Sequence, residues 1–221
     1  MSRLHRIWVS PSGSSRPFRI LCLVSVLLLA SCSAFQPVST ESVKIYALEA
    51  KLDGVAASNG KLTLFVSPTR AYPGFDTRRM VYVQQPHELG YFSRNEWADS
   101  PSRMFAPLLV QSLEHRGIFH AVVLSQNAAQ ADVRLDTEIV RLQQEFLSKP
   151  SKLHLTMRAQ LIDSSTRQVL ATQEFDVSEE APSDDPYGGV IAANRAVNTV
   201  LARIADFCSV QMANQPLHAG N

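Results

Sequence analysis

The sequence lacks the short motifs that mark most catalytic and metal centres. It contains no Cys-x-x-Cys pair, no His-Glu-x-x-His, no Gly-x-Ser-x-Gly and no glycine-rich loop that could cradle a phosphate. Its net charge of +1 comes from scattered basic and acidic residues, which gives no electrostatic footprint for nucleic acid. These absences predict a protein that is not an enzyme and that does not bind nucleic acid.

Acidic residues are also absent before Glu41, and this part of the chain has the composition of a secretory leader. Four arginines precede an apolar run from Ile20 to Ala30, and small residues follow, which is the order found in signal peptides. The run is too short to span a bilayer as a helix, which needs about 20 residues, and no later stretch approaches that length. Residues 1–31 are therefore predicted to be a signal peptide. The alternatives are an ordinary secretory leader, in which the cysteine that follows at position 32 occurs by chance, or a core helix.

The residues Leu29-Ala30-Ser31-Cys32 resemble the lipobox of bacterial lipoproteins. The resemblance implies cleavage before Cys32 and covalent lipid, palmitate included, on its thiol, with no other cofactor. Cys22 would leave with the leader, so Cys208 would be the one remaining thiol and no internal disulfide could form. Loss of the four arginines lowers the net charge from +1 to −3. Ser33 stands where an aspartate would retain an enterobacterial lipoprotein in the inner membrane, which implies the periplasmic face of the outer membrane.

Residues 32–42 are predicted to be a polar tether with a reach of roughly 30 Å. Residues 43–213 are predicted to form one α+β domain. Apolar alternation predicts strands at 132–140, 153–161 and 169–177, the last two joined as a hairpin. Shorter strands are expected at 43–48, 61–66, 80–83 and 118–124, with a loop at 68–77. Helices are expected from Ser100-Pro101 to the stop at Gly117, and over 190–208. Two helices on one face of a mainly antiparallel sheet make a two-layer sandwich. Residues 214–221 are predicted to be a flexible tail.

Three polar features near the C-terminal helix admit both a structural and a functional interpretation. The acidic pairs at 179–180 and 184–185 could bind a divalent cation through oxygen, but they lack the spacing of a calcium loop, so a solvated loop is favoured. Gly188-Gly189 is interpreted as a flexible hinge before the helix rather than an anion site. Cys208 lies on an apolar stripe and is predicted to be a small buried residue rather than a reactive thiol.

An aromatic segment carries Tyr82, Tyr91, Phe92 and Trp97 in what is predicted to be a loop-rich connection. Such side chains either bury under the edge of a domain or form the centre of an interface, where aromatic residues are enriched. All four are candidate partner-binding residues. Trp97 is also a candidate for a structural role, in which its side chain packs this segment against the helix that begins near Pro101.

The residue order in and after this segment is similar to that of the ABC-type transport auxiliary lipoproteins. The similarity extends roughly from Ile45 to Cys208 and rests on Arg79-Met80-Val81-Tyr82, Pro86-His87-Glu88-Leu89, Trp97-Ala98, Pro101, Met104, Leu108, Gly117, Phe119 and Ala131-Asp132. It implies a two-layer fold similar to the amino-terminal domain of TolB, without a catalytic residue or a metal site.

The resemblance also implies a function and partners. The chain would be a non-enzymatic docking subunit of an ABC transport system that moves lipids or other hydrophobic compounds between two membranes. Its partners would be the MCE-domain (mammalian cell entry) subunit, the permease and the ATPase of that system, and formation of a homo-oligomer is left open. The alternative function is that of an outer-membrane assembly lipoprotein similar to the partner of the lipopolysaccharide translocon.

Overall fold

The computed structural model describes residues 42–51, 58, 60–124 and 131–214. The predicted signal peptide, Cys32, the tether up to residue 41 and the tail from residue 215 lie outside the described residues. The elements are, in chain order, β1 (Lys44–Tyr46), β2 (Thr63–Val66), β3 (Arg70–Ala71), β4 (Arg79–Val83), β5 (Gly90–Trp97), α2 (Pro101–Arg116), β6 (Ala121–Val123), β7 (Val133–Glu145), β8 (Lys152–Asp163), β9 (Val169–Glu180) and α3 (Pro186–Asn214). Among the described residues, no helix is long and apolar enough to cross a membrane.

The strands form one mixed sheet in the order β1-β5-β4-β7-β2-β6, with β3 and β8 also paired to β7 and with β9 paired to β8. The three long strands β7, β8 and β9 are antiparallel, and Ile139, Met157 and Phe175 lie side by side across them. The short strands β2, β3 and β4 join β7 in parallel. The fold is therefore the predicted α+β sandwich, in which the longest pairings are antiparallel.

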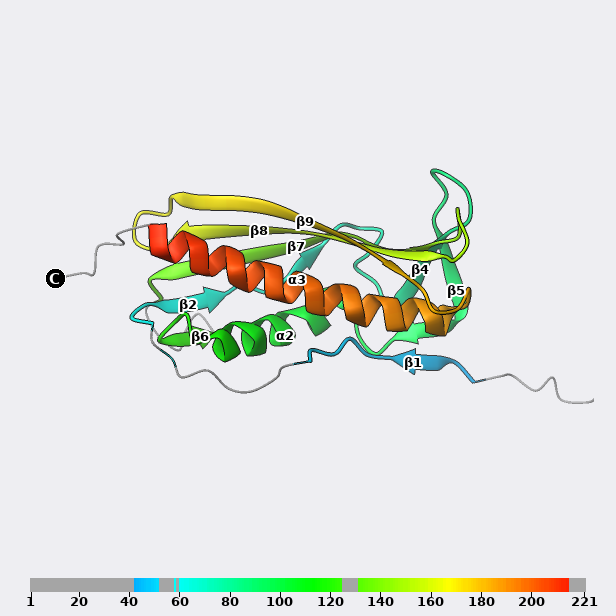
Figure 1. Ribbon diagram of the computed structural model, residues 1–221, viewed down its shortest axis with the longest axis horizontal. Coiled ribbons are helices and arrows are strands. Elements are labelled where there is room, and N and C mark those ends of the chain that lie inside the picture. Colours follow the sequence, from blue (N-terminus) through cyan, green and yellow to red (C-terminus); the bar gives the residue numbers. More distant parts are fainter. Residues whose placement is uncertain (1–41, 52–57, 59, 125–130, 215–221) are drawn as a thin grey trace, which may run out of the picture. The chain divides into compact units, whose positions relative to one another are not determined.

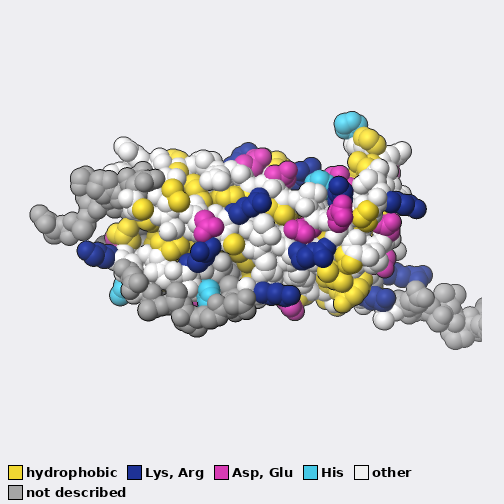
Figure 2. Space-filling model, viewed as in Figure 1, with side chains coloured by type: hydrophobic (Ala, Val, Ile, Leu, Met, Phe, Trp, Pro, Cys, Tyr) yellow, Lys and Arg dark blue, Asp and Glu magenta, His cyan; other side chains and the backbone are white. Residues whose placement is uncertain are grey.

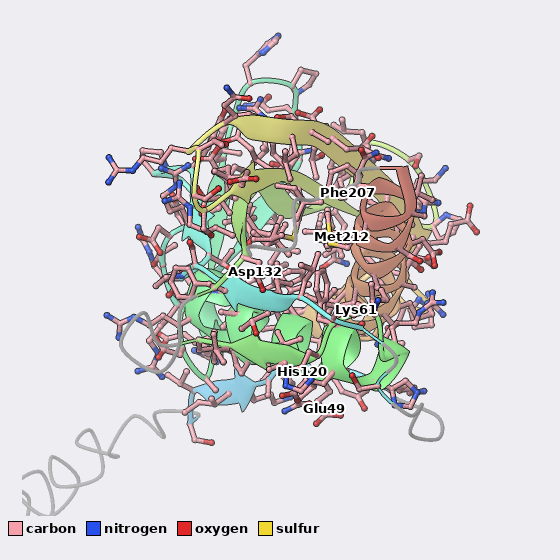
Figure 3. The ribbon with its side chains drawn as sticks, turned by 90° about the vertical axis from the view of Figure 1, so that its left-hand side faces the viewer. Glu49, Lys61, His120, Asp132, Phe207 and Met212 are labelled. Atoms are coloured by element: carbon pink, nitrogen blue, oxygen red, sulfur yellow. The ribbon has the colours of Figure 1, made fainter. Side chains whose placement is uncertain are left out.

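Both helices pack on one face of the sheet and on each other. Figure 1 shows α3 along the long strands β7, β8 and β9, with α2 beside it near β6. Figure 3 shows Phe207 and Met212 on the side of α3 that faces the sheet, and the Phe207 ring packs edge-on against Phe175 of β9. Of the apolar face predicted for α2, Phe105, Leu109 and Leu113 are buried, whereas Met104 and Leu108 are half-buried. The apolar stripe predicted for α3 is buried throughout: Val190, Ala193, Val197, Leu201, Ile204 and Cys208.

The faces of β8 agree with the alternation of its sequence. Leu155 and Met157 are fully buried, as predicted. His154 lies on the opposite face, but only 20% of its side chain is exposed, because its Nε2 lies 3.3 Å from a carboxylate oxygen of Glu145 in β7. The alternation over 153–161 predicts His154 on the solvated face, and this face is confirmed, but the side chain is half-buried there.

Two predicted boundaries need correction. The segment 90–97 is strand β5 rather than part of a loop, and the predicted loop at 68–77 contains the short strand β3. β5 escapes pattern analysis because the polar run Ser93-Arg94-Asn95-Glu96 interrupts its apolar alternation. β5 lies between β1 and β4, near one side of the sheet, where polar side chains can stay solvated.

Helix α3 is longer at both ends than predicted, because it begins at Pro186 and extends to Asn214. The carboxylate of Asp185 accepts the N–H of Gly188 at 2.7 Å and so caps the helix before the proline. The predicted start of α2 at Ser100-Pro101 is confirmed, and so is its end at Gly117, which has the left-handed φ of 64°. Asp185-Pro186 carries the same kind of start signal as Ser100-Pro101.

Candidate functional site

Three half-buried aromatic rings meet where β4, β5 and the turn after β7 converge. The ring of Tyr82 lies 4.7 Å from that of Phe92 and 6.3 Å from that of Phe146, centroid to centroid. The N–H of Phe146 donates to the carbonyl of Val83 at 2.8 Å, which fixes the turn beside β4. Gly90 lies opposite Tyr82 across the strand pair, and a Cβ at Gly90 would clash with the tyrosine ring. The glycine therefore makes room for the cluster.

Two exposed leucines lie on the loops that carry this cluster. Leu89, in the β4–β5 hairpin loop, is 44% exposed, and Leu147, in the β7–β8 turn, is 51% exposed. Figure 2 shows hydrophobic side chains on the loops that project at this end of the domain. We call Tyr82, Leu89, Phe92, Phe146 and Leu147 the aromatic end. Large rings with few rotatable bonds beside exposed aliphatic groups are the chemistry of protein interfaces.

The four aromatic candidates of the sequence do not form one site. Tyr82 and Phe92 belong to the aromatic end, whereas Tyr91 packs its ring under the guanidinium of Arg79, 3.7 Å away. Trp97 is only 3% exposed and belongs to the hydrophobic core. Trp97 therefore has no surface to offer a partner, and its burial agrees with the structural interpretation of this residue. Phe146 and Leu147 follow β7, and only strand pairing brings them to this segment. Leu89 lies within the segment, but a choice by aromatic residue type passes it over.

A groove of about 1050 Å³ lies between the N-terminal segment and the first half of α3. Ile45 and Tyr187 are 59% and 58% exposed on its walls, and Ile191 lines it as well. The rings of Tyr46 and Tyr187 are 6.1 Å apart. The groove leaves no local signal in the sequence, because its walls come from the two ends of the domain.

Two asparagines of α3 hold the extended chain at 47–51 by its backbone. Asn194 accepts the N–H of Glu49 at 2.7 Å and donates to the carbonyl of Ala47 at 3.3 Å. Asn198 accepts the N–H of Lys51 at 2.6 Å and donates to the carbonyl of Glu49 at 3.1 Å. Residues 49 and 51 lie two apart in an extended chain, and positions 194 and 198 lie one turn apart on the helix, so the two spacings match. We call these four hydrogen bonds the asparagine clamp.

The acidic residues before and at the start of α3 have structural partners. The N–H of Ser151 donates to Asp184 at 2.6 Å, and this hydrogen bond lowers the pKa of the aspartate below its usual value. Glu179 pairs with Arg195 at 3.5 Å, and Glu180 pairs with Lys152 at 3.8 Å. In the described part of the chain, no three His, Cys, Asp or Glu side chains come together as metal ligands. Glu180, Asp184 and Asp185 are exposed, as the prediction of a solvated segment requires. Glu179 and Glu180, however, end strand β9 and do not belong to a loop.

Gly188 and Gly189 lie inside the first turn of α3 rather than before it. A Cβ at Gly188 would clash with the carbonyl of Ser183, and one at Gly189 would clash with the side-chain oxygen of Gln144. Close packing explains this pair of glycines better than a hinge does. Cys208 is confirmed as a buried residue, and burial raises the pKa of its thiol to about 12, so the thiol stays protonated at neutral pH.

Comparison with known proteins shows a family match over most of the chain. Residues 46–205 match the family model described as "ABC-type transport auxiliary lipoprotein component". An uncharacterized protein, bll6063 from Bradyrhizobium diazoefficiens, is 26% identical over 152 residues, which cover 69% of this chain and 40% of the relative. The chain thus spans less than half the length of that curated relative.

Two solved structures share the fold. The crystal structure of protein XCC0632 from Xanthomonas campestris, of family DUF330, has a TM-score of 0.69 at 21% identity and covers 77% of this chain and 98% of its own. The crystal structure of an uncharacterized protein has a TM-score of 0.61 at 16% identity and covers 76% of this chain and all of its own. The predicted likeness to the amino-terminal domain of TolB stays a prediction.

Proposed function

The chain belongs to the family of ABC-type transport auxiliary lipoprotein components, and on that premise we propose that it is a docking subunit without enzymatic activity. Its lipid anchor on Cys32 holds it at the periplasmic face of the outer membrane. There it contacts the MCE-domain subunit of an ABC system, with its permease and ATPase, that moves lipids or other hydrophobic compounds between membranes.

The aromatic end carries this proposal. It combines a ring cluster, Tyr82 with Phe92 and Phe146, with two leucines that are about half exposed, Leu89 and Leu147. A few apolar anchors of this kind can supply most of the binding energy of an interface. The rings are braced by strand pairing between β4, β5 and β7, so the surface is already ordered before a partner binds.

Co-purification from membrane extracts tests the docking surface. We expect Leu89→Ser and Leu147→Ser to reduce capture of the MCE-domain subunit with little change in the melting temperature, because both side chains are about half exposed and lie outside the hydrophobic core. Val169→Ser is the matched control, since Val169 is 53% exposed at the start of β9 and outside the aromatic end. Capture that is unchanged in both leucine variants, or equally reduced in the control, would show that the surface is misplaced.

Labelling with radioactive palmitate tests the anchor. We expect Cys32→Ala to abolish the label and to leave an uncleaved precursor, because the thiol is the acceptor of the lipid. Separation of inner and outer membranes then locates the wild-type protein. Labelling that persists in the variant, or wild-type protein confined to the inner membrane, contradicts the corresponding part of the proposal.

A further inference from the structure

We propose that one corner of the domain, formed by Val43, Ile45, Tyr187 and Ile191, rests on the headgroup layer of the membrane that holds the lipid anchor. We call these four residues the membrane corner. The inference deepens the proposed function and rests on it, because it takes Cys32 as lipidated. The occupant of this apolar surface is a lipid bilayer, and the domain keeps one face toward it.

Three side chains of the membrane corner are exposed, and the fourth, Ile191, is half-buried. Val43, Ile45 and Tyr187 are 47–59% exposed, and Ile191 lines the same groove as Ile45 and Tyr187. Single exposed apolar residues are normal on protein surfaces, whereas clusters of them mark contact sites. Figure 2 shows hydrophobic side chains gathered on the visible face at the end of the domain where β1 and the start of α3 lie.

The position of the corner in the chain identifies the bilayer as its occupant. The described chain begins at Ser42, next to Val43, and the ten residues from Cys32 to Ser42 reach roughly 30 Å at most. The tether therefore confines this corner to within roughly 30 Å of the lipidated residue. Val210, which is equally exposed on the same helix, lies about 35 Å farther along α3 than Tyr187, at 1.5 Å per residue.

The asparagine clamp keeps this attachment point rigid. Asn194 and Asn198 fix residues 47–51 to α3, and β1 pairs with β5 on its other side. The tether therefore joins the domain at a point that cannot swing relative to α3. A short tether on a rigid point favours one orientation of the domain over the membrane.

The chemistry of the corner suits the headgroup layer. Tyrosine places an apolar ring and a polar hydroxyl at the boundary between lipid and water. The groove beside it carries Glu49 and Glu179 together with Lys51 and Arg195, so its formal charge is balanced. Apolar burial rather than attraction to anionic lipid must then hold the contact, and we expect it to be insensitive to salt.

Fluorescence quenching in proteoliposomes tests the inference on the full lipidated chain. Single cysteines at Ile45→Cys, Tyr187→Cys and, as the control, Val210→Cys carry an environment-sensitive fluorophore. Cys208 is fully buried and its thiol stays protonated, so it does not compete for the label. The vesicles contain phosphatidylethanolamine with a minority of phosphatidylglycerol and of a lipid that bears a nitroxide quencher at headgroup depth.

We expect the labels at 45 and 187 to lose most of their fluorescence to the lipid quencher, in low and high salt alike, and the label at 210 to keep it. Co-flotation of the chain with vesicles shows separately whether the lipid anchor attaches the chain to the membrane. A chain that does not float overturns the anchor and this inference together. A chain that floats with unquenched labels at 45 and 187, or with all three labels quenched alike, overturns the corner alone. A label at 45 that is shielded before vesicles are added shows that the chain itself covers the corner, which also refutes the inference.

Discussion

The asparagine clamp makes a prediction about one side chain, Asn198, that can be measured directly. In the structure, the N–H of Lys51 donates to the side-chain oxygen of Asn198, and the carbonyl of Glu49 accepts from its amide nitrogen. Asn198→Ala removes both bonds and leaves the buried apolar face of α3 intact, because Asn198 lies off the stripe that enters the core. We expect the N-terminal segment to open locally while the domain stays folded.

The magnitude follows from the two bonds that are lost. Each contributes about 0.5–1.5 kcal/mol net, so the segment loses about 1–3 kcal/mol of local stability. Since 1.4 kcal/mol is a factor of ten, the backbone amide of Lys51 should exchange with solvent deuterium roughly 5- to 140-fold faster. Amides in the centre of β8, such as that of Met157, should exchange at the wild-type rate because their strand is paired on both sides.

Two variants of the same helix serve as controls. Thr199→Ala should leave the amide of Lys51 protected, because the threonine hydroxyl donates to the carbonyl of Arg195 within α3. Asn198→Asp keeps the acceptor for the N–H of Lys51 but loses the donor to Glu49, so it should fall between wild type and Asn198→Ala. Unchanged exchange at Lys51 in Asn198→Ala would refute the clamp.

Two further predictions concern the long strands. Leu155→Ala should lower the free energy of unfolding by about 2–5 kcal/mol in denaturant titrations, since its side chain is 1% exposed. His154→Ala should lower the free energy of unfolding clearly less. An equal loss in the two variants would contradict the faces assigned to these residues. The pKa of Asp163 is lowered from 3.8, first by the hydroxyl of Ser165. Its contribution to stability is therefore complete above that value and is lost as the pH falls through the lowered pKa. Asp163→Asn should show a smaller drop in melting temperature between pH 7 and about pH 3 than wild type does.

The sequence predicts those parts of the fold in which the pattern and the packing coincide. β8 alternates almost without fault and is buried between β7 and β9, so its pattern reports its surroundings. β5 could not be found in this way, because its polar centre reflects a position near the side of the sheet. The start of α3 could have been found from Asp185-Pro186, since the same kind of signal located the start of α2.

The candidate surfaces were less accessible to sequence analysis. Tyr82 and Phe92 could be selected by residue type, but their partner Phe146 follows β7, and only the parallel pairing of β4 with β7 brings it close. Trp97 has the same residue chemistry as an interface anchor, and burial alone separates it from one. Burial of an aromatic residue depends on contacts that are distant in sequence, which a local pattern does not contain.

Substitution of Trp97 therefore gives the strongest test of whether an aromatic side chain of this segment belongs to the core or to a partner interface. It is 3% exposed, its backbone N–H donates to the carbonyl of Arg78 at 2.8 Å, and it pairs in register with Tyr46 of β1. Trp97→Ala should cost about 3–5 kcal/mol. At 2–4 °C per kcal/mol for a domain of this size, the melting temperature should fall by roughly 6–20 °C.

Trp97→Phe should restore part of that loss, because an aromatic ring again fills most of the site. Binding of the MCE-domain subunit, measured well below the lowered melting temperature, should match wild type in both variants, since the ring has no surface to offer. A Trp97→Ala protein that keeps its melting temperature and loses its partner would place the ring in the interface and contradict its assignment to the core.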